Sequence, residues 1–195
     1  MVDLGAGSGR LTAELARAAR RVVAVELDPS LAERLRGRWP NVEAVQADAR
    51  EVALPREPFR VVANLPFQGT NEILRHLLDD PRTPLVRADL VVQWGVAVKR
   101  ALPWPSTVNG VVWGAWYSVR VARRLPRSAF EPPPAVDAAV LVFERRPEPL
   151  VPPQQASRYR HFVAHGFRGG RRVVRAEPRQ LDPHEWASLY LRATA

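Results

Sequence analysis

The chain has 195 residues, with 29 lysines and arginines against 20 aspartates and glutamates, a net charge of +9. Its 46% hydrophobic and 25% charged residues are typical of a globular fold and exclude wholesale disorder. No apolar run approaches the ~18 residues of a membrane span, and the N-terminus lacks the features of a signal peptide. Cysteine is absent and the four histidines lack a zinc-binding spacing, so we expect a cytoplasmic protein with no metal and no membrane contact.

The positive charge comes almost entirely from arginine. Lys99 is the only lysine, so 28 of the 29 basic residues are arginines. The pI of about 11.2 lies above the value of roughly 9 that marks nucleic-acid-binding domains, and guanidinium groups match phosphate geometry. The charge therefore favours a nucleic acid partner. A mutational bias toward Arg, Ala, Pro and Val is the alternative explanation.

Short apolar runs alternate with helix-like stretches in the first half of the chain. The predicted strands are Val2–Leu4, Val22–Leu27, Val42–Gln46, Phe59–Ala63 and Asp89–Gln93, and the predicted helices are Leu11–Ala16, Leu31–Arg38 and Asn71–Leu78. This alternation implies right-handed crossovers and a mainly parallel sheet. Two later strands, Tyr117–Arg123 and Ala138–Phe143, face each other across a proline-rich link and predict an antiparallel pair at the end of the sheet.

A proline-rich segment separates the last third of the chain from the rest. Residues 147–153 contain four prolines, which favour an extended linker. Ser157–Gly166 and Pro183–Arg192 then have helical patterns, the second with the start signal Asp182-Pro183-His184-Glu185. Because about 40 residues are too few for a separate core, this tail should dock on the first domain. The predicted organisation is a domain over residues 1–146, then a linker and small helical appendage over residues 147–195.

A glycine-rich turn follows the first strand. The segment Asp3-Leu4-Gly5-Ala6-Gly7-Ser8-Gly9 lies between a strand and a helix, where glycines permit a sharp turn and the close approach of a ligand. Its G-x-G-x-G spacing departs from the G-x-G-x-x-G of dinucleotide folds, because Arg10 stands at the last position. A purely structural turn is the alternative interpretation.

Acidic residues follow the next two strands. Glu26 closes the second strand and is placed to accept hydrogen bonds from ribose hydroxyls, while Asp48, after the third, is placed to accept from an adenine amine. Each acid alone is more typical of a loop or cap position. Ligands of open α/β sheets bind at the carboxyl ends of the strands, so the ordered set of glycines and acids favours an adenosine-containing cofactor without a pyrophosphate. S-adenosylmethionine fits this description.

The fourth strand ends in Asn64-Leu65-Pro66-Phe67. The Asn64 side-chain oxygen can accept one hydrogen bond from an exocyclic amine, and a backbone carbonyl beside the proline can accept the second. Two acceptors favour a tetrahedral nitrogen whose lone pair is localised, so no strong base is required. Phe67 offers a face on which an unpaired base can stack. The alternative is a strand that ends in a structural turn.

These segments resemble the rRNA adenine N6-methyltransferases, and several others resemble the erythromycin-resistance 23S rRNA methylase branch of that family. The shared family segments are Val2–Gly9, Val23–Pro29, Gln46–Ala49, Asn64–Phe67 and Phe130–Asp137. Those typical of the resistance branch are 74–78, 88–93, 99–101, 105–107, 116–117, 159–167 and 178–181 before Trp186. The resemblance implies a Rossmann-like S-adenosylmethionine-dependent methyltransferase sheet with a small C-terminal helical appendage.

The resemblance also implies roles for individual residues. Gly5 and Gly7 would line the methionine end of the cofactor, Glu26 would bind the ribose, and Asp48 with Ala49 would bind the adenine. Asn64 would contact the cofactor as well as the target amine. The target amine and base would meet Asn64, Leu65, Pro66 and Phe67, with Phe130 as a second aromatic wall. Arg120, Arg123, Arg124 and Arg127, with Lys99 and Arg100, would contact RNA phosphates. The implied reaction is methyl transfer to N6 of an unpaired or flipped-out adenine of 23S rRNA by a monomer, which gives macrolide, lincosamide and streptogramin B resistance.

Two departures from the family are visible. A segment before the glycine turn, with a Gln-Asn-Phe-type element that closes over the cofactor, is missing, and the tail after Gly166–Gly170 is about a helix pair shorter. We therefore expect a shortened chain. The alternatives to an active 23S rRNA methylase are a non-catalytic RNA-binding relative and a small-subunit rRNA adenine dimethyltransferase.

Overall fold

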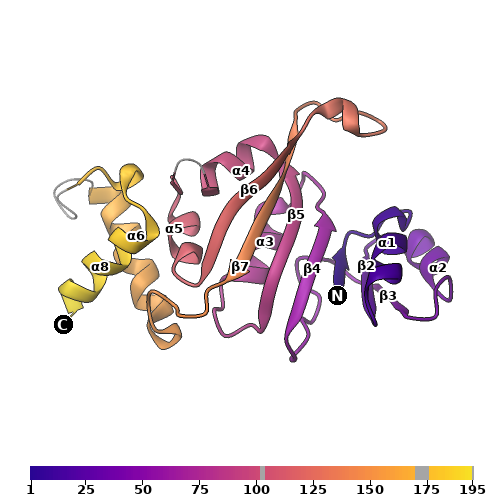
Figure 1. Cartoon of the computed structure of the whole chain (residues 1–195), viewed down its shortest axis with the longest axis horizontal. Coiled ribbons are helices and arrows are strands. Elements are labelled where there is room, and N and C mark those ends of the chain that lie inside the picture. Colours follow the sequence, from indigo (N-terminus) through magenta and orange to yellow (C-terminus); the bar gives the residue numbers. More distant parts are fainter. Residues whose placement is uncertain (102–103, 170–175, 195) are drawn as a thin grey trace. The chain divides into compact units, whose positions relative to one another are not determined.

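Residues 1–101, 104–169 and 176–194 are described by the computed structural model of the chain (Figure 1). Its elements in chain order are β1 (Val2–Leu4), α1 (Arg10–Ala18), β2 (Val22–Glu26), α2 (Pro29–Leu35), β3 (Val42–Gln46), β4 (Phe59–Asn64), α3 (Thr70–Leu78), β5 (Leu85–Gln93), α4 (Trp94–Ala101), α5 (Val108–Gly114), β6 (Tyr117–Leu125), β7 (Ala138–Arg145), α6 (Ala156–Gly169) and α8 (Pro183–Thr194). The chain divides into a first unit, residues 1–79 and 83–92, and a second unit, residues 80–82 and 93–195. The domain boundary expected at residue 147 stays a prediction.

The first unit contains parallel strands in the order β3-β2-β1-β4-β5. The short strand β1 lies between β2 and β4, and its side chains Val2, Asp3 and Leu4 are all buried. Four of these strands begin at the predicted residue and β5 begins four residues earlier than predicted, because buried apolar runs carry a strong pattern. The predicted α/β class with a mainly parallel sheet is confirmed.

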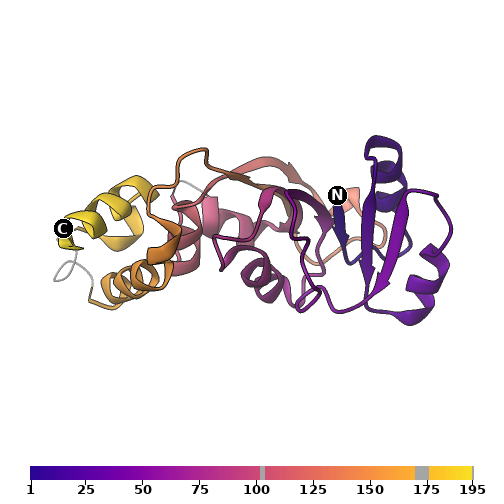
Figure 2. The same ribbon diagram turned by 90° about the horizontal axis from the view of Figure 1, so that it is seen from below.

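The second unit contains the antiparallel pair of β6 and β7. Its register runs from Tyr117 opposite Arg145 to Leu125 opposite Ala138, which confirms the predicted pairing. Helices α6 and α8 lie side by side in Figures 1 and 2. Their contact is aromatic, since Phe162 packs edge-on against both Trp186 and Tyr190. Among the described residues, no helix combines the length and apolar character needed to cross a bilayer.

The buried carboxyl of Asp3 lies on β1, just before the glycine turn. The Asp3 side chain is 1% exposed, and its Oδ2 accepts a hydrogen bond from Thr12 Oγ1 at 2.7 Å. Burial, with a smaller contribution from the nearby Glu26, raises the pKa of Asp3 to about 6. The folded state therefore holds this proton up to a higher pH than the unfolded chain does, so the stability that Asp3 contributes falls as the pH rises from about 4 to 6.

We expect Asp3→Asn to remove this loss of stability. Relative to the unchanged chain, its free energy of unfolding should rise by about 2–3 kcal/mol between pH 4 and pH 7, because two pKa units correspond to about that energy. Urea unfolding of both proteins at several pH values measures the difference, and other titrating groups cancel in the comparison. A difference that stays constant with pH would show that Asp3 titrates normally.

Candidate active site

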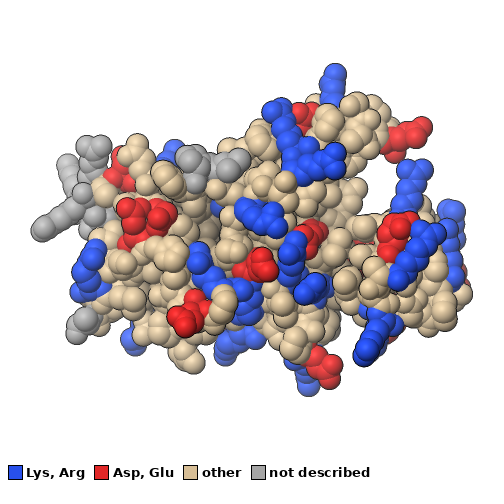
Figure 3. Space-filling view, viewed as in Figure 1, with Lys and Arg blue, Asp and Glu red and all other residues tan. Residues whose placement is uncertain are grey.

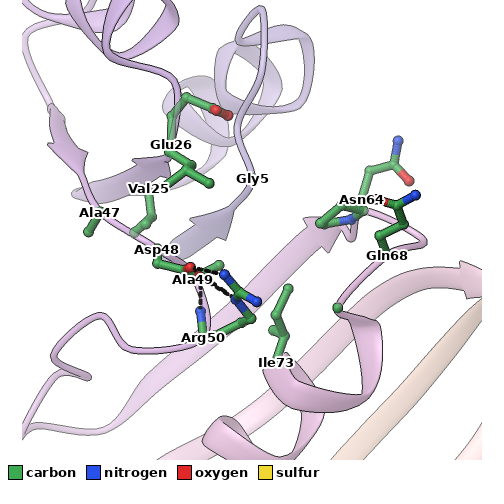
Figure 4. A pocket seen from close by; sticks show the side chains of 13 residues that line it. Gly5, Val25, Glu26, Ala47, Asp48, Ala49, Arg50, Asn64, Gln68 and Ile73 are labelled. Atoms are coloured by element: carbon green, nitrogen blue, oxygen red, sulfur yellow. Dashed lines mark hydrogen bonds and ion pairs between the residues drawn. The ribbon is translucent and has the colours of Figure 1, made fainter.

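A cavity of about 480 Å³ lies at the carboxyl ends of β1, β2, β3 and β4 in the first unit (Figure 4). Its lining consists of Gly5, Val25, Glu26, Leu27, Ala47, Asp48, Ala49, Arg50, Asn64, Pro66, Gln68, Gly69 and Ile73. The turn after β1, the Glu26 carboxylate at the end of β2, the Asp48 carboxylate after β3 and the Asn64 amide at the end of β4 therefore face one space. The parallel sheet brings them together because the strands end at the same edge.

The glycine turn approaches the loop after β4 closely. Gly5 and Gly7 have φ values of +74° and +56°, a left-handed backbone conformation that residues with a side chain rarely adopt. The Gly5 and Ala6 N–H groups both donate to the Val25 carbonyl, at 2.9 and 3.0 Å, which fixes the turn on β2. A Cβ atom on Gly5 would lie 3.4 Å from Pro66 Cδ. An added Cβ would thus already be in van der Waals contact with Pro66, and the two loops leave little space for a side chain that extends further in that direction.

Glu26 is held in place by two backbone groups. Its Oε2 accepts a hydrogen bond from the Gly7 N–H at 2.7 Å, and its Oε1 accepts one from the Asp28 N–H at 2.9 Å. Each oxygen keeps a second lone pair for a further donor. Gly7 does not line the cavity, and in this structure it acts on the cavity through Glu26.

Asp48 is bound by Arg50, a residue that the sequence analysis did not single out. Asp48 Oδ1 accepts from the Arg50 N–H at 2.8 Å, and Arg50 Nε lies 2.9 Å from both carboxylate oxygens. The Arg50 Nη2 group also donates to Oδ2. These hydrogen bonds lower the pKa of Asp48 to about 2, so the carboxylate is ionised at neutral pH.

The loop after β4 is hydrogen-bonded to β5 and to α3. Asn64 is exposed at the end of β4, whereas the Leu65 side chain is 2% exposed and the Leu65 N–H donates to the Val91 carbonyl at 3.1 Å. Thr70 Oγ1, at the start of α3, donates to the Pro66 carbonyl at 2.7 Å and lies 3.3 Å from the Phe67 carbonyl. The hydroxyl thereby holds the loop on α3.

Neither Phe67 nor Phe130, the two aromatic residues assigned to the site, lines the cavity. Phe67 is half-buried and does not line the cavity. Phe130 is half-buried in the second unit, just after the short 3-10 helix Arg127–Ala129. The stacking roles of Phe67 and Phe130 remain predictions.

The cavity has further lining residues that sequence reasoning missed. They are Val25, Leu27, Ala47, Arg50, Gln68, Gly69 and Ile73. Leu27 is 60% exposed although it directly follows a buried strand, and an exposed leucine beside an acid at a strand end is a usable sign of an apolar ligand surface. The others carry no distinctive pattern, because they join the cavity only through the fold.

The chain is similar in sequence to an rRNA methyltransferase and to an antibiotic-resistance protein. It is 37% identical over 165 residues to an rRNA adenine N-6-methyltransferase of Corynebacterium diphtheriae, which covers 84% of this chain and 64% of that protein. It is 33% identical over 215 residues to the mycinamicin-resistance protein MyrB of Micromonospora griseorubida, with 97% and 68% covered. The chain therefore spans about two thirds of the length of these relatives.

A solved structure supports the same grouping. The crystal structure of the 23S rRNA methyltransferase ErmE matches with a TM-score of 0.81 and 28% identity, over 100% of this chain and 90% of that one. The sequence model of the family described as ribosomal RNA adenine dimethylase matches residues 1–191, nearly the full length. The chain belongs to the ribosomal RNA adenine dimethylase family.

Proposed function

We propose that this protein transfers methyl groups from S-adenosylmethionine to N6 of a specific adenine in 23S rRNA, and so gives macrolide, lincosamide and streptogramin B resistance. The observation that supports this most directly is the single cavity lined by Gly5, Glu26, Asp48 and Asn64. The names of ErmE, a 23S rRNA methyltransferase, and of MyrB, a mycinamicin-resistance protein, favour the large-subunit target and the resistance.

The cavity fits the cofactor. Its volume of about 480 Å³ lies within the roughly 300–1,000 Å³ of small-molecule sites. In the proposed complex Glu26 would accept hydrogen bonds from the ribose hydroxyls and Asp48 from the adenine amine, and the exposed Leu27 would offer apolar surface to the base. When bound, S-adenosylmethionine supplies an electrophilic methyl group on a sulfonium.

Asn64 and the loop behind it hold the attacking amine. The Asn64 side-chain oxygen accepts one N6 hydrogen. The Pro66 carbonyl already accepts a hydrogen bond from Thr70 Oγ1, so we assign the second N6 hydrogen to the Leu65 carbonyl. The Leu65 N–H donates to the Val91 carbonyl, which holds this residue against β5. The acceptors keep the nitrogen tetrahedral and its lone pair directed at the methyl group, and positioning and electrostatics supply the catalysis. The methylated N6 nitrogen would then lose a proton to water, and S-adenosylhomocysteine would be the leaving group.

The RNA contact is assigned to basic side chains of β6 and its following turn. Figure 3 shows Lys and Arg side chains gathered over the β6–β7 hairpin. Exposed members of this group are Arg120, Arg123, Arg124 and Arg127. Arg124 also pairs with Asp137 at 2.8 Å. Arg100, in contrast, is 7% exposed and lies 5.7 Å from the Trp113 ring centre, so a phosphate contact there requires rearrangement.

Incubation of the purified chain with labelled S-adenosylmethionine and rRNA tests the proposal. We expect label at one adenine of 23S rRNA, mapped by a stop in reverse transcription, and none in 16S rRNA. Label in 16S rRNA alone would instead indicate a small-subunit dimethyltransferase. RNA binding that is salt-dependent without cofactor binding would indicate a non-catalytic relative, and either result contradicts the proposal.

A further inference from the structure

Arg50 lines the cavity and encloses the carboxylate that faces it. Its backbone N–H, Nε and Nη2 all donate to Asp48, so the two residues form a fork from three donor groups (Figure 4). The Asp48 side chain is 22% exposed and the Arg50 side chain 51% exposed. The carboxylate is therefore the inner member of the pair, and the guanidinium lies toward solvent.

The fork limits how Asp48 can meet a ligand. A carboxylate offers about four lone-pair sites, and the Arg50 groups make four contacts with them, two of which share the single Nε–H. The shared hydrogen leaves the carboxylate with spare capacity for one more donor. An ionised carboxylate in this orientation accepts from an amine and repels a carbonyl oxygen.

The Arg50 stem also reaches the helix that follows the Asn64 loop. A Cβ atom on Gly69, the residue that caps α3, would lie 3.6 Å from Arg50 Cδ. The guanidinium is thus held by Asp48, and the stem passes beside Gly69, where a side chain at position 69 would touch it. A fixed fork sets the Asp48 carboxylate in one direction more firmly than a mobile surface ion pair does.

We propose that Arg50 is a positioning residue that orients Asp48 to select a purine with an exocyclic amine over a 6-oxo purine. This inference rests on the proposed function, because it requires the cavity to hold an adenosine cofactor. Within that function it assigns the base selectivity to the Asp48–Arg50 pair, with Arg50 acting through the carboxylate.

Calorimetric titration with S-adenosylhomocysteine and S-inosylhomocysteine tests the inference on Arg50→Ala and Arg50→Lys. We expect Arg50→Ala to weaken the adenosyl ligand about tenfold, the effect of one charge-assisted hydrogen bond, and to change the inosyl ligand less than about twofold. Arg50→Lys keeps the charge without the fork, so it should lose the same selectivity.

Arg82→Ala is the matched control. Arg82 makes the same two-residue fork with Asp80, through its N–H at 3.0 Å, Nε at 2.9 Å and Nη2 at 3.0 Å, and it does not line the cavity. Its loss should leave both affinities unchanged.

Each other outcome has a distinct meaning. Equal weakening of both ligands by Arg50→Ala would assign a merely structural role, and tighter adenosyl binding would show that Arg50 obstructs the amine. Either result overturns the inference, as does an unchanged chain that binds both ligands equally. An unchanged chain that binds neither ligand overturns the proposed function itself, and this inference with it.

Discussion

Asn64→Ala should lower the rate of methyl transfer by at least about 100- to 1,000-fold, the usual cost of removing one precisely placed polar group from a transition state. Asn64 is exposed at the end of β4 and lines the cavity, so alanine leaves the strand and the cavity wall intact. Cofactor affinity should stay within about tenfold, or 1.4 kcal/mol, because Glu26 and Asp48 are unchanged. Single-turnover methylation and titration with S-adenosylhomocysteine measure the two effects.

Asn71→Ala provides the control for this substitution. Asn71 is an exposed amide on α3 that does not line the cavity, so its loss should leave transfer near its normal rate. An Asn64→Ala protein that methylates as fast as this control would refute the role given to Asn64. A loss of cofactor binding equal to the loss of rate would move Asn64 from the acceptor amine to the cofactor.

Gly9→Ala should destabilise the first unit by about 2–5 kcal/mol. Gly9 caps α1 with φ +80°, a conformation that costs other residues about 1–2 kcal/mol. The added methyl would also lie 2.6 Å from Leu35 Cδ2 and 3.1 Å from the Trp39 ring, and overpacking of this kind costs about 1–3 kcal/mol. Leu35 is 1% exposed, so its side chain has little space to move away.

Gly37→Ala separates the two contributions. Gly37 has φ +67° but nothing lies within 4 Å of its added Cβ, so only the backbone cost applies. Denaturant unfolding should therefore show a markedly larger loss for Gly9→Ala than for Gly37→Ala. If the two losses are equal, Leu35 and Trp39 repack freely and the steric argument is wrong.

Apolar periodicity and start signals were sufficient for most elements but not for the helices α4 and α5. The sequence of α5 contains valines and two glycines, which disfavour helix. Burial decides its structure, since Val111 and Trp113 are both 0% exposed and Thr107 Oγ1 accepts from the Gly110 N–H at 3.1 Å. Such tertiary stabilisation leaves little trace in the local pattern.

Element ends were harder to predict than element positions. Strand β5 begins at Leu85, earlier than the predicted Asp89, because Arg87 and Asp89 stand two residues apart and pair at 2.7 Å within the strand. These charged residues interrupt the apolar pattern, so the sequence did not predict the first half of the strand. Helix α2 begins at Pro29 because Asp28 accepts from the N–H groups of Ser30 and Leu31.

Some residues of the candidate site could also be recognised from the sequence, and others could not. Gly5, Glu26, Asp48 and Asn64 were recognisable because each lies at or just after the carboxyl end of a strand and is a residue type suited to contact a ligand. Arg50 was not, since an arginine two residues after an aspartate is common on surfaces; Arg82 has the same spacing outside the cavity. Only the fold distinguishes the two arginines.

The close approach of the glycine turn to Pro66 has an evolutionary consequence, because a Cβ atom at position 5 would already touch the Pro66 ring at 3.4 Å. A side chain that extends beyond Cβ toward the proline would displace the Pro66 ring, and with it the loop that begins at Asn64. Under the proposed function, affinity for the methyl donor and geometry at the methyl acceptor should therefore change together. Successful changes at these two positions should arise as compensating pairs, and directed evolution of either half should randomise both together.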